Sequence, residues 1–160
     1  MGNGETPEKV SIIVCSGDMD KVMGAFIIAN GAAAFDMEVT MFFTFWGLKA
    51  IQKGNLTGSS FFGRMLGMMN RGGVDRLGPS KFNFGGMGRW MFKKMMKNHN
   101  VMPLAELVRQ AREQGVRLIA CEMSMNVMEI AKEHLIDGVE IAGVATYISE
   151  ASESKFSLFI

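Results

Sequence analysis

The sequence contains two cysteines, and each one ends a short apolar run of the kind that forms a buried strand. Cys15 ends the run at residues 10–15, and Cys121 ends the run at residues 116–121. Open α/β sheets place their chemistry beyond the carboxyl ends of the strands. A thiol there faces the positive end of the next helix, which favours thiolate. Such a thiolate is a nucleophile that can hold sulfane sulfur as a persulfide.

Each cysteine also has a structural interpretation. Cys121 can be a small, inert core residue, because unpaired cysteines are often buried. For Cys15 the alternatives are a buried core residue and a second or resolving thiol. If the two strands are neighbours, the thiols lie close together, but the sequence leaves open whether they can pair. Ser124 or nearby backbone N–H groups are candidates to stabilise an anion on Cys121, whereas Glu122 would oppose it.

Gly17 lies in the turn after the first predicted strand, and with Ser124 it completes the set of candidate substrate-binding residues. The turn is similar to a phosphate-binding turn, but no glycine-rich nucleotide motif is present. Asp18 and Asp20 are expected to be helix-capping or first-turn acids. The two histidines are isolated in the sequence and no C-x-x-C occurs, so we expect neither a metal nor a cofactor.

Strand-like and helix-like segments alternate along the chain, which predicts a three-layer α/β/α sandwich with a mainly parallel sheet of about five strands. The expected strands are residues 10–15, 38–43, 116–121, 139–144 and 156–160. The expected helices are residues 21–35, 46–53, 103–114, 126–134 and 146–151. Ser124 is the expected cap of the helix at residues 126–134.

The composition restricts the class of protein. With 160 residues and 48% hydrophobic residues, the chain is expected to form a single domain over residues 1–160 rather than a disordered segment. A net charge of +1 gives no bias toward nucleic acid. Two cysteines do not form a disulfide scaffold, so reduced thiols in the cytoplasm are expected. The longest apolar stretch, around residues 41–46, is too short to span a bilayer.

Residues 54–100 interrupt the alternation of strand-like and helix-like segments, and we call them the basic insert. They contain eight basic residues, one acidic residue and seven of the 16 methionines, while the rest of the chain carries a net charge of −6. Residues 90–97 could form a basic amphipathic helix. A solvated flap and contact with an anionic membrane surface or substrate are alternatives. We favour an interface with another protein or a second copy, because methionine-rich surfaces adapt to partners and the apolar side chains would otherwise be exposed.

Several blocks of sequence in order resemble the DsrE/DsrF-like family, and more closely its peroxiredoxin-like DsrE subgroup. The resemblance covers about residues 10–147. The blocks that carry it are residues 11–21, 25–32, 40–48, 85–88, 121–125 and 136–140.

The resemblance implies a DsrE-like fold, small homo-oligomers and a role in sulfur relay, as a sulfurtransferase or carrier. Members of the wider family take sulfane sulfur onto a cysteine and pass it to a next carrier, often a small TusA-like protein. The family's cysteine falls on Cys121, and Cys15 falls on a position where related chains can also carry one. A non-catalytic binding or oligomeric module, using the strand-end cleft and the basic insert, is the alternative function.

Overall fold

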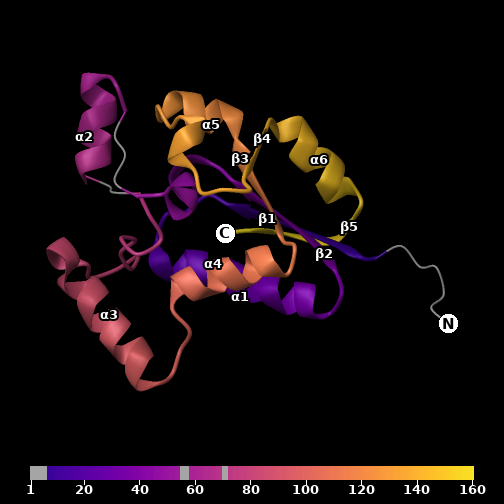
Figure 1. Ribbon diagram of the computed structural model, residues 1–160, viewed down its shortest axis with the longest axis horizontal. Coiled ribbons are helices and arrows are strands. Elements are labelled where there is room, and N and C mark those ends of the chain that lie inside the picture. Colours follow the sequence, from indigo (N-terminus) through magenta and orange to yellow (C-terminus); the bar gives the residue numbers. More distant parts are fainter. Residues whose placement is uncertain (1–6, 55–57, 70–71) are drawn as a thin grey trace.

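The computed structural model describes residues 7–54, 58–69 and 72–160 (Figure 1). Five strands form within these ranges, and the first two, residues 9–14 and 38–43, are rich in β-branched or aromatic residues. Their bounds are β1 (Lys9–Val14), β2 (Glu38–Phe43), β3 (Arg117–Cys121), β4 (Glu140–Ala142) and β5 (Ser154–Phe159). The helices are α1 (Met19–Ala34), η1 (Phe45–Ile51), α2 (Phe61–Met69), η2 (Phe84–Gly86), α3 (Met87–Asn98), α4 (Leu104–Glu113), α5 (Glu122–Val127), η3 (Lys132–His134) and α6 (Val144–Ser152).

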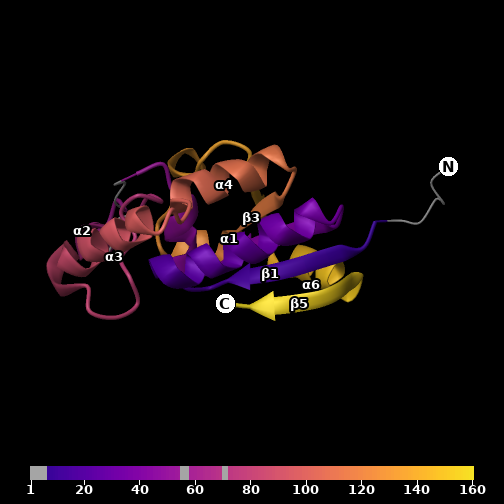
Figure 2. The same cartoon turned by 90° about the horizontal axis from the view of Figure 1, so that it is seen from below.

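The described strands form one parallel sheet in the order β4-β3-β2-β1-β5. Both faces of this sheet are covered, as a parallel sheet requires. Helices α1 and α4 pack together on one face, and α5 and α6 lie on the other (Figures 1 and 2). The α/β class and the expected parallel sheet of five strands are confirmed.

Strand order also creates a switch point. The chain passes from β1 through β2 and β3 to β4, and then returns across the sheet to place β5 on the far side of β1. The connections after β1 and before β5 run on opposite faces, through α1 and α6 respectively (Figure 1). In open α/β sheets, ligands bind in the crevice that forms at such a point, beyond the carboxyl ends of the strands. Cys15 directly follows β1 and therefore lies at this crevice.

Two sequence-based expectations about the helices after β3 are wrong. The helix expected at residues 126–134 begins earlier, at Glu122, and ends at Val127, with a separate short turn at Lys132–His134. Ser124 is consequently inside α5 and does not cap it, because Cys121 occupies the N-cap position. The hydroxyl of Ser124 instead forms a hydrogen bond with the hydroxyl of Thr44.

The basic insert contains helices of its own. α2, η2 and α3 project beyond the carboxyl edge of the sheet (Figures 1 and 2). The expected amphipathic helix at residues 90–97 lies within α3, which begins three residues earlier, at Met87. Two parts of the insert, residues 55–57 and 70–71, lie outside the described residues.

The core between α1 and the sheet gives a direct test of the fold. Phe26 on α1 is fully buried, and its ring lies 6.0 Å from that of Phe43 on β2. We expect Phe26→Ala to lower the free energy of unfolding by about 3–5 kcal/mol, because it leaves a cavity in a packed core. Urea denaturation measures this change.

A matched control is Phe35→Ala at the end of the same helix, where the side chain is 84% exposed. Its unfolding free energy should stay within about 0.5 kcal/mol of the wild type. Equal losses in the two variants would contradict the packing described here.

Candidate functional site at the carboxyl edge of the sheet

The register of three neighbouring strands sets the positions of the two cysteines. Val14 pairs with Phe43, and Phe43 pairs with Ala120, so the residues that come next in the chain, Cys15, Thr44 and Cys121, lie at one level. β2 separates the cysteines, which puts their Cα atoms roughly 10 Å apart. That separation exceeds the range for a disulfide without backbone movement. Both thiols are free.

Strand alternation places both cysteines on the same face of the sheet, the face covered by α6. Cys121 packs there in a small apolar cluster with Phe42, Ile119 and Tyr147. Tyr147 comes from α6, and its ring lies 5.2 Å from that of Phe42. This cover leaves Cys121 only 4% exposed. A reagent therefore reaches the thiol of Cys121 only if this cover moves.

Ser124 is fully buried in the first turn of α5. Its hydroxyl shares a 2.7 Å hydrogen bond with the hydroxyl of Thr44, the residue that follows β2. This bond fixes the start of α5 against the end of β2, and so holds the backbone beside Cys121. Ser124 thus lies near one cysteine, but it does not line the cavity described next.

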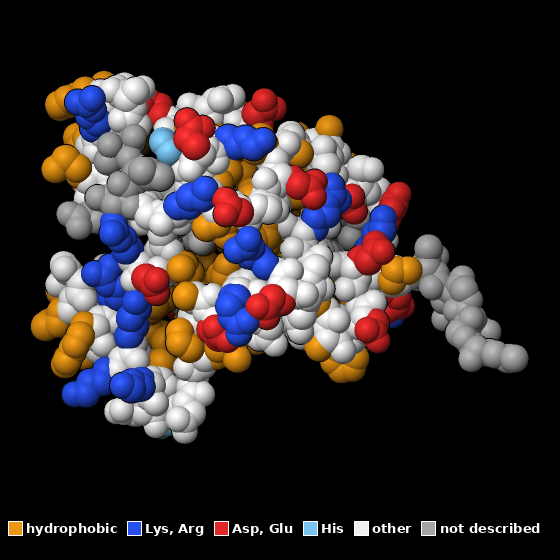
Figure 3. Space-filling view, in the orientation of Figure 1, with side chains coloured by type: hydrophobic (Ala, Val, Ile, Leu, Met, Phe, Trp, Pro, Cys, Tyr) orange, Lys and Arg blue, Asp and Glu red, His pale blue; other side chains and the backbone are white. Residues whose placement is uncertain are grey.

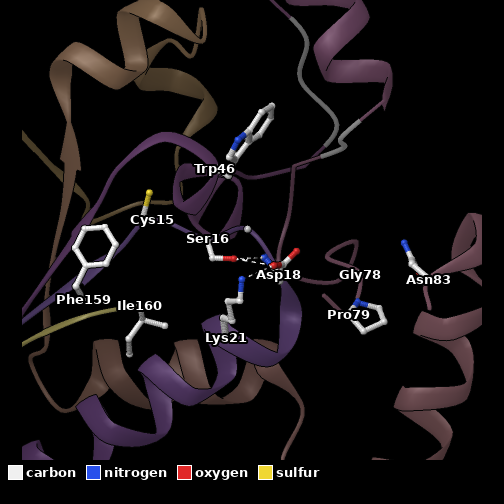
Figure 4. A pocket seen from close by; sticks show the side chains of 11 residues that line it. Cys15, Ser16, Asp18, Lys21, Trp46, Gly78, Pro79, Asn83, Phe159 and Ile160 are labelled. Carbon is white, nitrogen blue, oxygen red and sulfur yellow. Dashed lines mark hydrogen bonds and ion pairs between the residues drawn. The ribbon is translucent and has the colours of Figure 1, made fainter. Parts of the chain in front are cut away.

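Cys15 opens onto a cavity of about 770 Å³ at the switch point between β1 and β5 (Figure 4). The walls come from the turn after β1, from η1, from the end of β5 and from the basic insert. The lining residues are Cys15, Ser16, Gly17, Asp18, Lys21, Trp46, Gly78, Pro79, Asn83, Phe159 and Ile160. Of the two cysteines, Cys15 is the one that lines this cavity, and it is partly exposed.

A cation and a carboxylate face this cavity. The Lys21 ammonium lies 3.0 Å from the carboxylate of Asp18, which in turn accepts a hydrogen bond from the Ser16 hydroxyl. The hydrogen bond that the ammonium donates to Asp18 is the main cause that raises the pKa of Lys21, and the negative charges of Asp18 and Asp20 add to it. Lys21 therefore stays cationic at neutral pH beside the thiol. An anionic sulfur species bound here would meet that charge.

Gly17 shapes the cavity through its size. A Cβ atom at this position would lie 2.7 Å from the backbone oxygen of Trp46, closer than real side chains pack. The turn after β1 and the start of η1 can therefore approach each other only because residue 17 is glycine. Gly17 does line the cavity, but in this role it acts through the backbone.

The basic insert supplies one wall because it is tied to the start of α1. The Asp20 carboxylate accepts hydrogen bonds from both the backbone N–H and the hydroxyl of Ser80, each 2.7 Å long. The backbone N–H of Met19 also donates to the oxygen of Gly78. These bonds hold residues 78–83 against the cavity. Asp20 is a first-turn acid, as expected, but its partner comes from the insert.

Sequence reasoning missed most of the cavity walls. It identified Cys15 and Gly17, but not Lys21, Trp46 or Asn83, which come from three different segments. Lys21 could have been predicted from the sequence, because it follows the turn after the first strand and lies three residues after Asp18, a spacing that allows an ion pair. Asn83 offered none, since only the tertiary contact through Ser80 brings its segment here.

In the part of the chain that the structure describes, no group of three or more His, Cys, Asp or Glu side chains is placed to hold a metal ion. None of the described helices is both long and apolar enough to cross a bilayer.

Comparison with known proteins identifies the relationship. The model of a family described as DsrE/DsrF/DrsH-like matches residues 6–159. The chain belongs to this family. The match confirms the resemblance drawn from the sequence blocks and covers both cysteines.

Individual relatives agree with this membership. The chain is 47% identical over 158 residues to the uncharacterized protein YrkE of Bacillus subtilis, covering 98% of this chain and 99% of the relative. It is 36% identical over 157 residues to the sulfur carrier protein DsrE2 of Allochromatium vinosum, covering 96% and 98%. Among solved structures, the ychN protein of E. coli matches with a TM-score of 0.53 at 13% identity, covering 96% of this chain and 99% of that one, which shows a shared fold.

The different burial of the thiols predicts different reactivity. In the native protein, iodoacetamide should label Cys15 on the order of tenfold or more faster than Cys121, because an opening that costs about 1.4 kcal/mol already slows a reaction about tenfold. Peptide mapping by mass spectrometry gives the two rates. Tyr147→Ala should speed the labelling of Cys121 selectively, and in urea both cysteines should react. Equal native rates would rule out the cover on Cys121.

The contact between Asp20 and Ser80 predicts a pH dependence. Burial tends to raise the pKa of Asp20, but the two hydrogen bonds from Ser80 outweigh it, and the pKa lies below its usual 3.8. A carboxyl with a lowered pKa stabilises the fold above its unfolded pKa, and that stability is lost as the pH falls through the folded value. The wild type should therefore lose more unfolding free energy than Asp20→Asn as the pH drops below 3.8.

Chemical denaturation at a series of pH values measures this difference. Asp36→Asn is the control, because Asp36 is exposed and its side chain makes no hydrogen bond to the described residues. The control should follow the wild-type curve. Parallel curves for the wild type and Asp20→Asn would show that the bond to Ser80 contributes no pH-dependent stability.

Proposed function

We propose that this protein is a sulfur carrier, which holds sulfane sulfur as a cysteine persulfide and passes it to an acceptor thiol. Family membership supports a role in sulfur relay in general, as does the 36% identity to a relative named a sulfur carrier protein. The observation that carries the proposal is the placement of two free thiols at the carboxyl edge of the sheet, on one face and at one level. This edge is where open α/β proteins hold their ligands.

The proposed reaction has two exchanges without net oxidation. A cysteine thiolate attacks the outer sulfur of a thiosulfate or persulfide donor; the new S–S bond forms as the donor's S–S bond breaks, and its electron pair leaves with sulfite or a thiolate. An acceptor thiolate then attacks the terminal sulfur of the cysteine persulfide. The cysteine leaves as thiolate, and the acceptor carries the persulfide.

We assign the persulfide to Cys121, the residue on which the resemblance to the family places its cysteine. Its apolar cover of Phe42 and Tyr147 would keep a bound persulfide away from reductants in solution. Sulfur can then reach or leave Cys121 only if α6 moves and carries Tyr147 away from the thiol. Cys15, at the cavity that holds Lys21, is the proposed second thiol and the site where an anionic donor enters.

The proposal extends to partners and setting. The acceptor is a small TusA-like carrier or another thiol protein, and the carrier itself forms a homo-oligomer in the cytoplasm, with residues 1–160 as one domain. No nucleic acid takes part.

A second candidate function is a non-catalytic binding or oligomeric module. The burial of Cys121 favours it, because an inert core cysteine would have the same surroundings. In this case the strand-end cavity and the basic insert bind a partner or a small anion without covalent chemistry.

Intact-mass spectrometry after incubation with thiosulfate or polysulfide separates these functions. We expect the wild type and Cys15→Ser to gain the mass of one sulfur atom, which a thiol reductant should remove. Cys121→Ser should gain no mass. Loss of the adduct only in Cys15→Ser would move the persulfide to Cys15. A folded, reduced protein with no adduct on either cysteine would reject the carrier in favour of the binding module. Circular dichroism of each variant verifies folding.

A further inference from the structure

The basic insert presents a distinct surface, here called the basic lobe and defined as residues 58–69 and 72–102. Its helices α2 and α3 lie beyond the carboxyl edge of the sheet rather than on either face (Figures 1 and 2). The Glu129 carboxylate accepts a hydrogen bond from the backbone N–H of Ser60, just before α2, and so ties α2 to the body of the protein. Within the lobe, Lys93 on α3 donates to the backbone oxygen of Asp75. Phe92 and Met96 of α3 pack against the main core.

Large apolar side chains are exposed across the basic lobe, far beyond the scattered few that a soluble surface carries. Met87, Met91 and Met95 follow one face of α3 at a spacing of four residues, and they border an apolar hollow of about 420 Å³. The exposed apolar residues of the lobe's helices and their flanks are Phe61, Phe62, Met65, Met68, Met69, Phe82, Phe84, Met87, Trp90, Met91 and Met95.

Positive charge is interspersed with these side chains. Blue and orange side chains gather together at the left end of the face in Figure 3, where α2 and α3 lie in Figure 1. Within the described residues, Asp75 is the lobe's one acid, and none of the lobe's bases forms an ion pair. The bases are Arg64, Arg76, Lys81, Arg89, Lys93, Lys94 and Lys97.

This combination restricts the partner. A two-fold contact of the lobe with the same lobe on a second copy would bring bases against bases. A nucleic acid duplex would neutralise the bases, but its phosphate backbone would offer the phenylalanine and methionine side chains no apolar contact. An anionic lipid surface accommodates both, because the headgroups attract Lys and Arg while the acyl boundary takes up the apolar side chains.

Trp90 and Lys94 illustrate the fit on α3. Trp90 is 61% exposed, and the ammonium of Lys94 lies 5.2 Å from its ring centroid. Tryptophan and lysine both combine an apolar body with a polar end, and both are favoured at the headgroup level of membranes. α3 has 12 residues and α2 has nine, too few to cross a bilayer. These helices suit a position along the membrane surface.

We propose that the basic lobe docks this protein on an anionic lipid surface. The inference concerns location and holds whether or not either cysteine carries sulfur. Gly78, Pro79 and Asn83 belong both to the lobe and to the wall of the Cys15 cavity. Docking therefore brings the mouth of that cavity close to the membrane.

Flotation of the full-length protein with lipid vesicles tests the proposal. The protein should float with vesicles of phosphatidylcholine plus phosphatidylserine and remain below with phosphatidylcholine alone, and binding should weaken as salt is added. The double variant Lys94→Gln/Lys97→Gln should lower the partition coefficient by roughly tenfold or more. Trp90→Ala should also weaken binding.

The matched controls remove the same kinds of side chain, positive charges and an aromatic ring, from positions outside the basic lobe. Arg112→Gln/Lys155→Gln removes two exposed positive charges outside the lobe, and Phe35→Ala removes an exposed aromatic ring from the end of α1. Both should float like the wild type, and thermal unfolding verifies that all variants fold. Absence of flotation with anionic vesicles at low salt, or equal effects of lobe and control variants, would overturn the proposal.

Two other results would assign the basic lobe to a different occupant. Sedimentation that shows an oligomer lost in the lobe variants, without vesicle binding, would assign the lobe to contact between copies and overturn lipid docking. Tight binding of an oligonucleotide without vesicle binding would likewise overturn it.

Discussion

The register between β1, β2 and β3 is the constraint on which the candidate site depends. It sets Cys15, Thr44 and Cys121 side by side at the carboxyl edge, on one face of the sheet. A shift of one residue in a strand would turn its side chains to the opposite face. The buried apolar residues on both faces prevent such a shift, because Ile12, Met41 and Leu118 belong to one face and Phe42 and Ile119 to the other. Core packing therefore positions the thiols.

The same register gives the thiols opposite surroundings. β1 lies next to the returning strand β5, so Cys15 reaches the switch-point cavity with its cation at Lys21. β3 lies under α6, so Cys121 is closed in by Tyr147. One thiol is thus accessible and the other protected. In the proposed carrier, the open cavity beside Cys15 would admit the donor, and the cover on Cys121 would shelter the persulfide.

The sequence was sufficient for the sheet and insufficient for the site. The apolar runs ending at Cys15 and Cys121 predict strands correctly, because a strand buried on both faces leaves a continuous signal. The sequence predicts a later start for the helix after β3, because Ser124 resembles a capping residue, whereas its hydroxyl forms a hydrogen bond with Thr44. The exposure of the cysteines cannot be predicted from the sequence, because it depends on segments distant in the chain. The position of β5 beside β1 decides the exposure of Cys15, and Tyr147 decides that of Cys121.

The last two residues of the chain have a practical importance that follows from the cavity. Phe159 and Ile160 form part of its wall, and the backbone oxygen of Ile160 accepts a 2.7 Å hydrogen bond from the N–H of Cys15. A purification tag or fluorescent protein fused directly after Ile160 would therefore begin at the mouth of the Cys15 cavity. Fusions placed before β1, where the chain leaves the opposite end of the sheet, keep this entrance clear (Figure 1).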